Sequence, residues 1–155
     1  MELSLKADTL TLTSEKREIL LNAQGLTLDA LFIDTPWEYE KWGFLCYVRQ
    51  AEEWLIYQFQ VEGMMGAFIC EEKIELSSGL LDFLSDVDVL FVLGSRELRP
   101  AIEKIDPRIL VIFWENGRDL ASTFSVTDAV SQCKMKASDF LPDTMSCILM
   151  EHDGK

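Results

Sequence analysis

The hydrophobic pattern changes character about halfway along the chain, and this change constrains the fold more than any other sequence feature. At the start, leucines alternate with polar residues, as in Leu3, Leu5, Leu10 and Leu12. Such alternation is typical of strands that bury one face of an antiparallel sheet. Residues 87–93 and 109–113 are instead almost continuously apolar, which indicates strands covered on both faces. The sequence therefore predicts a hairpin-rich, antiparallel first half and a β/α second half.

The first half is predicted to consist of strands joined by short turns. The expected elements are strands at 18–22 and Leu26–Asp34, an aromatic loop at 37–42, a hairpin of strands at 44–49 and 54–60, and a loop at 63–66 that holds Met64 and Met65. Leu26–Asp34 is apolar enough to be a central strand, and Pro36 ends it because proline has no N–H for the ladder.

The second half predicts a βαβ unit. Apolar residues at 75–84 have helical spacing, and strands at 87–93 and 108–114 flank a short helix, Leu98–Ile105, with Pro100 in its first turn. Strands joined in this way are parallel, with a right-handed crossover. Ser125 is a suitable cap for a further helix over Val126–Cys133, and residues 145–150 are expected to form the last strand.

The length of 155 residues fits one ordinary domain. We expect a single α/β (α+β) domain over residues 1–151 and a frayed tail at 152–155. The expected architecture is a layered αββα-type sandwich, a mixed sheet with antiparallel N-terminal hairpins and a C-terminal βαβ half.

Composition limits the partners and the compartment. The net charge of −13 repels phosphates and anionic membranes, so neither nucleic acid nor a membrane is expected as a partner. The charge favours solubility, and an acidic mimic that occupies a basic partner is an alternative. No apolar run approaches a membrane span, which makes a cytoplasmic location the expectation. The four cysteines form no C-x-x-C pair and lie among apolar residues, so we expect reduced, buried thiols.

Several segments carry a resemblance to a known family. Glu18–Asn22 is similar to a strand that precedes a metal-binding loop, Asp86–Gly94 to a strand before a helix, Pro107–Val111 to the strand that leads to a late histidine, and Lys134–Pro142 to a segment before the final strand. Over most of its length, the chain resembles the metallo-β-lactamase-like hydrolase superfamily, in particular its small prokaryotic members. The resemblance implies a sandwich fold and, in ordinary members, a dinuclear zinc centre.

The chain departs from this family at the metal ligands. It contains one histidine, His152, and no H-x-H-x-D-H signature. No aspartate stands near Glu62, where the bridging ligand would be expected, and the late histidine would fall near Trp114. The stretch from Asn22 to Leu26 is also too short for the usual helix. A dinuclear zinc site needs several neutral imidazoles, so we expect a degenerate relative without metal or other cofactor.

Other chemistries have weaker support in the sequence. Oxygen ligands for Mg²⁺ or Ca²⁺ could come from acidic residues at 38, 40, 52–53, 71–72, 86 and 88, but none has EF-hand spacing. Cysteine or serine nucleophiles lack a histidine base in the body of the chain. Gly94, Ser95 and Arg96 follow a buried strand and precede a helix, a context in which α/β proteins bind ligands. With Glu115 and Asn116 they are the candidate residues of a strand-end cleft.

Aromatic and methionine side chains gather in other predicted loops and are typical of contact surfaces. The candidate interface residues are Trp37, Tyr39, Trp42, Met64, Met65 and Trp114. One or both of the first two tryptophans could instead fold back over the sheet as a lid. The leading hypothesis is a non-catalytic, metal-free domain that acts by protein–protein interaction, with a homodimer among the expected contacts. The alternative is a small-ligand-binding protein or hydrolase that uses the strand-end cleft.

Overall fold

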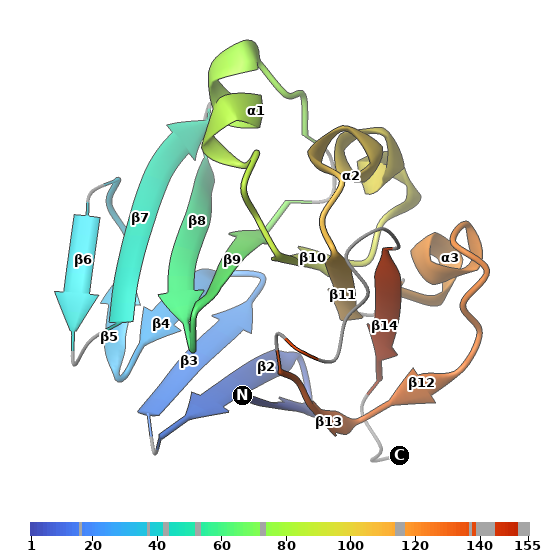
Figure 1. Cartoon of the computed structure of the whole chain (residues 1–155), viewed down its shortest axis with the longest axis horizontal. Helices are drawn as coiled ribbons and strands as arrows, with labels where there is room; N and C mark the ends of the chain where they lie inside the picture. Colours follow the sequence, from blue (N-terminus) through green and yellow to red (C-terminus); the bar gives the residue numbers. More distant parts are fainter. Residues whose placement is uncertain are drawn as a thin grey trace.

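The computed structural model describes residues 1–15, 17–36, 38–41, 44–51, 54–71, 74–113, 117–136, 138 and 145–151. Two sheets pack face to face, and short helices lie on the outer side of one of them (Figure 1). This confirms the expected layered sandwich with antiparallel hairpins at the start of the chain and a β/α half after them.

The N-terminal hairpins form a six-stranded sheet. Its order is β13 (Gln132–Lys134), β1 (Glu2–Lys6), β2 (Thr9–Ser14), β3 (Arg17–Asn22), β4 (Gly25–Leu28) and β5 (Leu31–Ile33), and every pairing is antiparallel. The alternating leucines of β1 and β2 are buried, which confirms the alternation as a one-faced core signal.

The prediction of one central strand over Leu26–Asp34 is wrong. Asp29 and Ala30 have φ values of 45° and 75° and form a two-residue turn between β4 and β5. This is the geometry of a type I′ hairpin turn, which favours asparagine, aspartate and glycine. Alanine is unusual at this turn position, and Ala30 is followed by apolar residues, so the sequence gives little indication of the turn. As a result, β5 lies at the end of the sheet instead of its middle.

The remaining strands form a mixed, eight-stranded sheet. Its order is β12 (Ala129–Val130), β14 (Ser146–Met150), β11 (Ile109–Phe113), β10 (Val89–Leu93), β9 (Met64–Ile69), β8 (Trp54–Val61), β7 (Phe44–Ala51) and β6 (Glu38–Lys41). The strands from β12 to β9 are parallel and those from β9 to β6 antiparallel. The predicted hairpin of β7 and β8 is confirmed.

Two predicted loops are strands. Residues 38–41 of the expected aromatic loop form β6, and Met64 and Met65 begin β9. The turn between β8 and β9 is only Glu62 and Gly63, both with positive φ, so the methionines are already in the ladder.

The helices are short. They are α1 (Ser78–Phe83), α2 (Arg99–Ile105), which follows the 3₁₀ turn η1 (Arg96–Leu98), and α3 (Gly117–Ser122). Ser77 caps α1 by accepting a hydrogen bond from Leu80 N at 3.2 Å. The β10–α2–β11 unit is parallel, as predicted.

The predicted helix over Val126–Cys133 is wrong, because this segment supplies β12 and β13. Its backbone also serves both sheets directly, since Ser131 O accepts from Leu5 N and Val130 O from Glu151 N. Pairing at two sheet edges therefore overrides the local helix signal. The sequence analysis did not predict α3.

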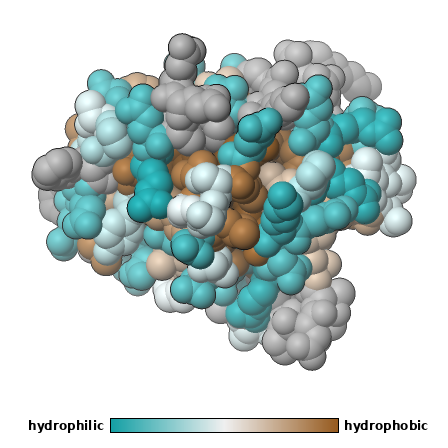
Figure 2. Space-filling view, turned by 90° about the horizontal axis from the view of Figure 1, so that it is seen from above, coloured by the Kyte–Doolittle hydropathy of each residue, from teal (hydrophilic) through white to brown (hydrophobic). Residues whose placement is uncertain are grey.

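Two apolar clusters hold the layers together. One fills the space between the sheets, and the other lies between the eight-stranded sheet and the helices. Hydrophobic side chains also gather in the middle of the face seen from above, within a rim of hydrophilic ones (Figure 2). No described helix is long and apolar enough to cross a membrane.

The chain passes between the two sheets at opposite sides of the sandwich. The β5–β6 connection makes the passage at one side and the β12–β13 connection at the other (Figure 1). Because β5 and β6 are each the last strand of their sheet, the first of these sides presents two sheet edges to solvent.

Candidate functional site

The carboxyl ends of the parallel strands meet at one edge, where α/β proteins commonly bind ligands. Of the predicted cleft residues, Gly94, Ser95 and Arg96 follow β10, at the same edge as Glu151, which follows β14 and was not predicted. Glu115 and Asn116 lie outside the described residues.

Ser95, Arg96 and Arg118 at this strand-end edge have partners within the protein. Ser95 Oγ accepts from Glu97 N at 3.3 Å and caps η1. Arg96 lies 3.6 Å from Asp119. Arg118 pairs with Glu151 and donates to Thr127 O at 2.9 Å. Ser95 and both arginines therefore already serve the protein's own acids and backbone.

The cysteines do not supply reactive thiolates in this structure. All four are free, and burial raises the pKa of Cys46 to about 12 and that of Cys70 to about 11. Burial also raises the pKa of Cys147 to about 11. These three thiols are protonated near neutral pH, and a protonated thiol is a poor nucleophile and a poor metal ligand.

The described side chains do not fit the zinc centre that the resemblance implies. They contain no group of three or more histidine, cysteine, aspartate and glutamate residues placed to hold a metal ion. The single histidine, His152, lies outside the described residues. Glu62, near the expected position of the bridging aspartate, accepts instead from the Met1 ammonium at 2.8 Å and from Ser14 Oγ at 2.6 Å. These hydrogen bonds lower the pKa of the Glu62 carboxyl.

Asp88 also has a structural role. Its carboxylate accepts from Met65 N at 2.9 Å and lies 3.6 Å from Arg108. Its own backbone bonds to β9 and to Ile109. Asp88 therefore acts as a structural residue at the start of the buried strand β10.

The β5–β6 side of the sandwich exposes large apolar side chains. Leu31 and Phe32 of β5 are 43% and 47% exposed, and with Val130 they are the exposed large hydrophobic residues of the described chain. Tyr39 on β6 is half-buried against the inter-sheet core, and its hydroxyl donates to Thr35 O at 3.0 Å. The sequence-predicted Trp37 and Trp42 lie outside the described residues, as does Trp114.

The two methionines of the predicted interface lie elsewhere. Met64 is 3% exposed and packs between the sheets, while Met65 is half-buried on the helix side. Alternation along β9 explains why the two side chains face opposite layers. Neither forms part of a surface with Tyr39.

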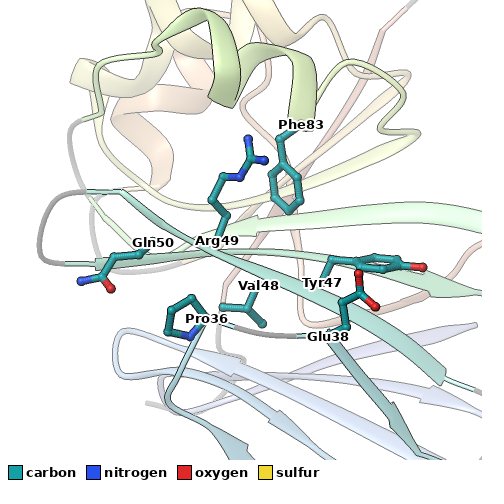
Figure 3. A pocket seen from close by; sticks show the side chains of 7 residues that line it. All are labelled: Pro36, Glu38, Tyr47, Val48, Arg49, Gln50 and Phe83. Carbon is teal, nitrogen blue, oxygen red and sulfur yellow. The ribbon is translucent and has the colours of Figure 1, made fainter.

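A hollow of about 570 Å³ lies beside β7, where its described pairing with β6 ends at Tyr47↔Glu38. Its lining residues are Pro36, Glu38, Tyr47, Val48, Arg49, Gln50 and Phe83. Figure 3 shows Arg49 and Phe83 on the α1 side of β7, and Pro36 and Val48 on the other. The Arg49 guanidinium donates to Gly79 O at 2.9 Å and lies 4.9 Å from the Phe83 ring centroid.

Acidic residues outnumber basic ones on this side of the molecule. Residues 26–41 contain four acidic residues and one basic residue, Lys41, and Asp34, Glu38 and Glu40 are exposed. We call Leu31, Phe32, these three acids and the hollow the crossover edge. The sequence analysis named Tyr39 on this side but missed Leu31 and Phe32. Only Asp29 hints at the turn that places both on an edge strand, because Ala30 is not a usual turn residue.

Comparison with known proteins identifies the fold. No family model matches the chain, and no curated protein does. A solved structure from Thermotoga maritima, described as a candidate zinc-dependent hydrolase of the metallo-β-lactamase superfamily, is similar with a TM-score of 0.75. The alignment covers 97% of this chain and 98% of that one, at 12% sequence identity. At this identity the likeness shows the fold alone: the chain has a metallo-β-lactamase-like fold.

Proposed function

We propose that this protein is a non-catalytic, metal-free binding module that acts through protein–protein contact at the crossover edge. The observation that carries the proposal is the exposure of Leu31 and Phe32 on the outermost strand of a sheet, shortly before Pro36, which lines the hollow. Isolated apolar residues on a surface are ordinary, but an apolar edge strand is a template for association and is usually protected by charge or covered.

The chemistry at the other edge supports a role without catalysis. A hydrolase of this fold would need metal ligands or an activated nucleophile near the strand ends. Arg96 and Arg118 there are instead paired with Asp119 and Glu151. The thiols of Cys46, Cys70 and Cys147 are protonated near neutral pH, because burial raises their pKa.

Site-specific photo-crosslinking in cells tests the proposal. A photo-reactive phenylalanine analogue at position 32 should give a defined protein adduct. The same analogue at Lys104, an exposed position on α2, should not. Equal labelling at both positions, or none at position 32, would contradict the proposal.

A thermal-shift screen with divalent metals and phosphates tests the competing hydrolase or ligand-binding function. We expect no shift of the unfolding temperature. Clear stabilisation by Zn²⁺ or Mg²⁺ at about micromolar concentrations would favour a ligand site over a contact surface.

A further inference from the structure

The crossover edge has two features that together specify its partner: outward-facing backbone on β5, and exposed acids that form no ion pair with a described side chain. The backbone feature comes from β5, the last strand of the six-stranded sheet. Leu28 and Leu31 close the two-residue turn, so ladder alternation puts Phe32 in the next, non-hydrogen-bonded position. The N–H and C=O of Phe32 therefore point away from β4, toward the open side of the sheet.

The hollow lies beside β7, a strand of the other sheet. Among the described residues, the pairing of β6 with β7 ends at Tyr47↔Glu38, while β7 itself runs to Ala51. Pro36 cannot extend that ladder because it has no N–H. The apolar residues that line the hollow lie on both sides of β7, Pro36 and Val48 on one side and Phe83 on the other (Figure 3).

The charge feature comes from the acids around these edges. Asp34, Glu38 and Glu40 are exposed, and no described side chain forms an ion pair with them. The nearest described cation in the hollow, Arg49, is engaged by Gly79 O and the Phe83 ring. The whole chain has a net charge of −13, so the negative charge at this edge adds to a negative charge of the protein as a whole.

From these features we infer that the crossover edge binds a basic, extended segment of another protein by strand addition. The segment pairs with the free side of β5, sets its lysine or arginine side chains against Asp34 and Glu38, and places an apolar side chain in the hollow. Main-chain hydrogen bonds and alternating side-chain sites are the usual means of such recognition. A second copy of this chain is a poor occupant, because it would bring the same acids to the same edge.

This inference rests on the proposed function and names its partner class. Strand addition also explains why the edge is short and acidic. Three residues of β5 support few ladder bonds, which limits pairing with arbitrary strands, and the acids select partners of opposite charge.

A peptide titration on the full chain tests the inference. The probe is a fluorescent peptide of alternating lysine and valine, compared with the glutamate–valine peptide and with a lysine–valine peptide whose pairing amides are N-methylated. We expect only the unmethylated basic peptide to bind, and its affinity to fall at least tenfold between about 50 and about 500 mM salt. Equal binding of the acidic or the N-methylated peptide would overturn strand addition by a basic segment.

Charge reversal at the edge supplies the matched variants. Asp34→Lys with Glu38→Lys should weaken binding of the basic peptide about tenfold. Asp128→Lys with Glu97→Lys makes the same change in net charge at exposed acids outside the crossover edge, and should weaken it less than about twofold. Equal losses in the two double variants would overturn the inference, because binding would then follow net charge alone.

Two results separate this inference from the proposed function. If position 32 crosslinks a protein in cells but no basic peptide binds, the contact surface stands and the partner class is wrong. If sedimentation shows a dimer that Phe32→Lys abolishes, the edge belongs to a second copy and the basic partner is rejected.

Discussion

The two edges of the sandwich that could meet a partner differ in how their polar and apolar groups are satisfied. At the strand-end edge, Arg96 and Arg118 pair with acids of the same chain, and Ser95 caps the turn that follows it. At the crossover edge, Leu31 and Phe32 are exposed beside acids without a described ion-pair partner. α/β proteins commonly bind ligands at the first edge, whereas we propose the second edge as the contact surface of this chain. Under this proposal, the fold offers both edges and the side chains select between them.

The largest expected effect is a loss of stability where β5 is attached to the rest of the protein. Gly25 has a φ of +137°, and a Cβ there would lie 2.6 Å from the hydroxyl of Tyr57. That hydroxyl donates to Ile33 O at 3.3 Å, so Gly25→Ala should disturb the attachment of β5. We expect a loss of about 2–4 kcal/mol in the free energy of unfolding, measured by urea denaturation.

Gly63→Ala is the matched control for this variant. Gly63 also has a positive φ, +76°, but nothing lies within 4 Å of the added methyl. Its cost should be the backbone strain alone, about 1 kcal/mol. Equal costs for the two variants would mean that the packing under β5 is less tight than the structure indicates.

The next prediction is a variant that loses contact with the partner but keeps its stability. Phe32→Lys places a charge on the exposed edge, so the yield of partner crosslinked at a neighbouring position should fall at least tenfold. The free energy of unfolding should change by less than about 0.5 kcal/mol, because the ring is half exposed. Phe32→Leu, which keeps an apolar side chain, should retain most of the contact.

A smaller effect is expected at the strand-end edge. Arg118→Ala removes the pair with Glu151 and the hydrogen bond to Thr127 O, both at the surface. It should lower the free energy of unfolding by less than about 1 kcal/mol and leave the crosslink at position 32 unchanged. Loss of the crosslink would show that the two edges are not independent and would remove the contrast between them.

The smallest effect is a pH dependence remote from both edges. The Met1 ammonium and the Ser14 hydroxyl lower the pKa of Glu62, so its stabilisation is complete above the ordinary glutamate pKa of about 4.3 and is lost as pH falls through the lower, folded value. Glu62→Gln should flatten the pH dependence of unfolding below about pH 4.5. Ser14→Ala, which leaves the ammonium in place, should flatten it only in part. An unchanged profile in Glu62→Gln would show that the pair does not form in solution.

Elements with strong periodicity were predictable from the sequence. The alternating leucines of β1 and β2, the apolar runs of β10 and β11 and the helix between them lie as the pattern indicates. Elements that depend on distant pairing were not. The segment at 126–133 has a plausible helix cap, yet it completes the edges of two sheets, and residues 38–41 look like a loop but pair with β7.

The sequence by itself determined that the chain lacks the ligands of a histidine-rich zinc centre, because it contains one histidine whatever its fold. It also determined the two kinds of sheet, because hydrophobic period reports how many faces of a strand are buried. Only the tertiary structure decided which side chains stay exposed and unpaired. The Asp29–Ala30 turn moves Leu31 and Phe32 from an expected central strand to a sheet edge. Folding pairs the arginines at one edge, whereas the exposed acids at the other have no ion-pair partner among the described side chains. Exposure and pairing depend on neighbours far apart in the sequence, so local pattern does not encode them.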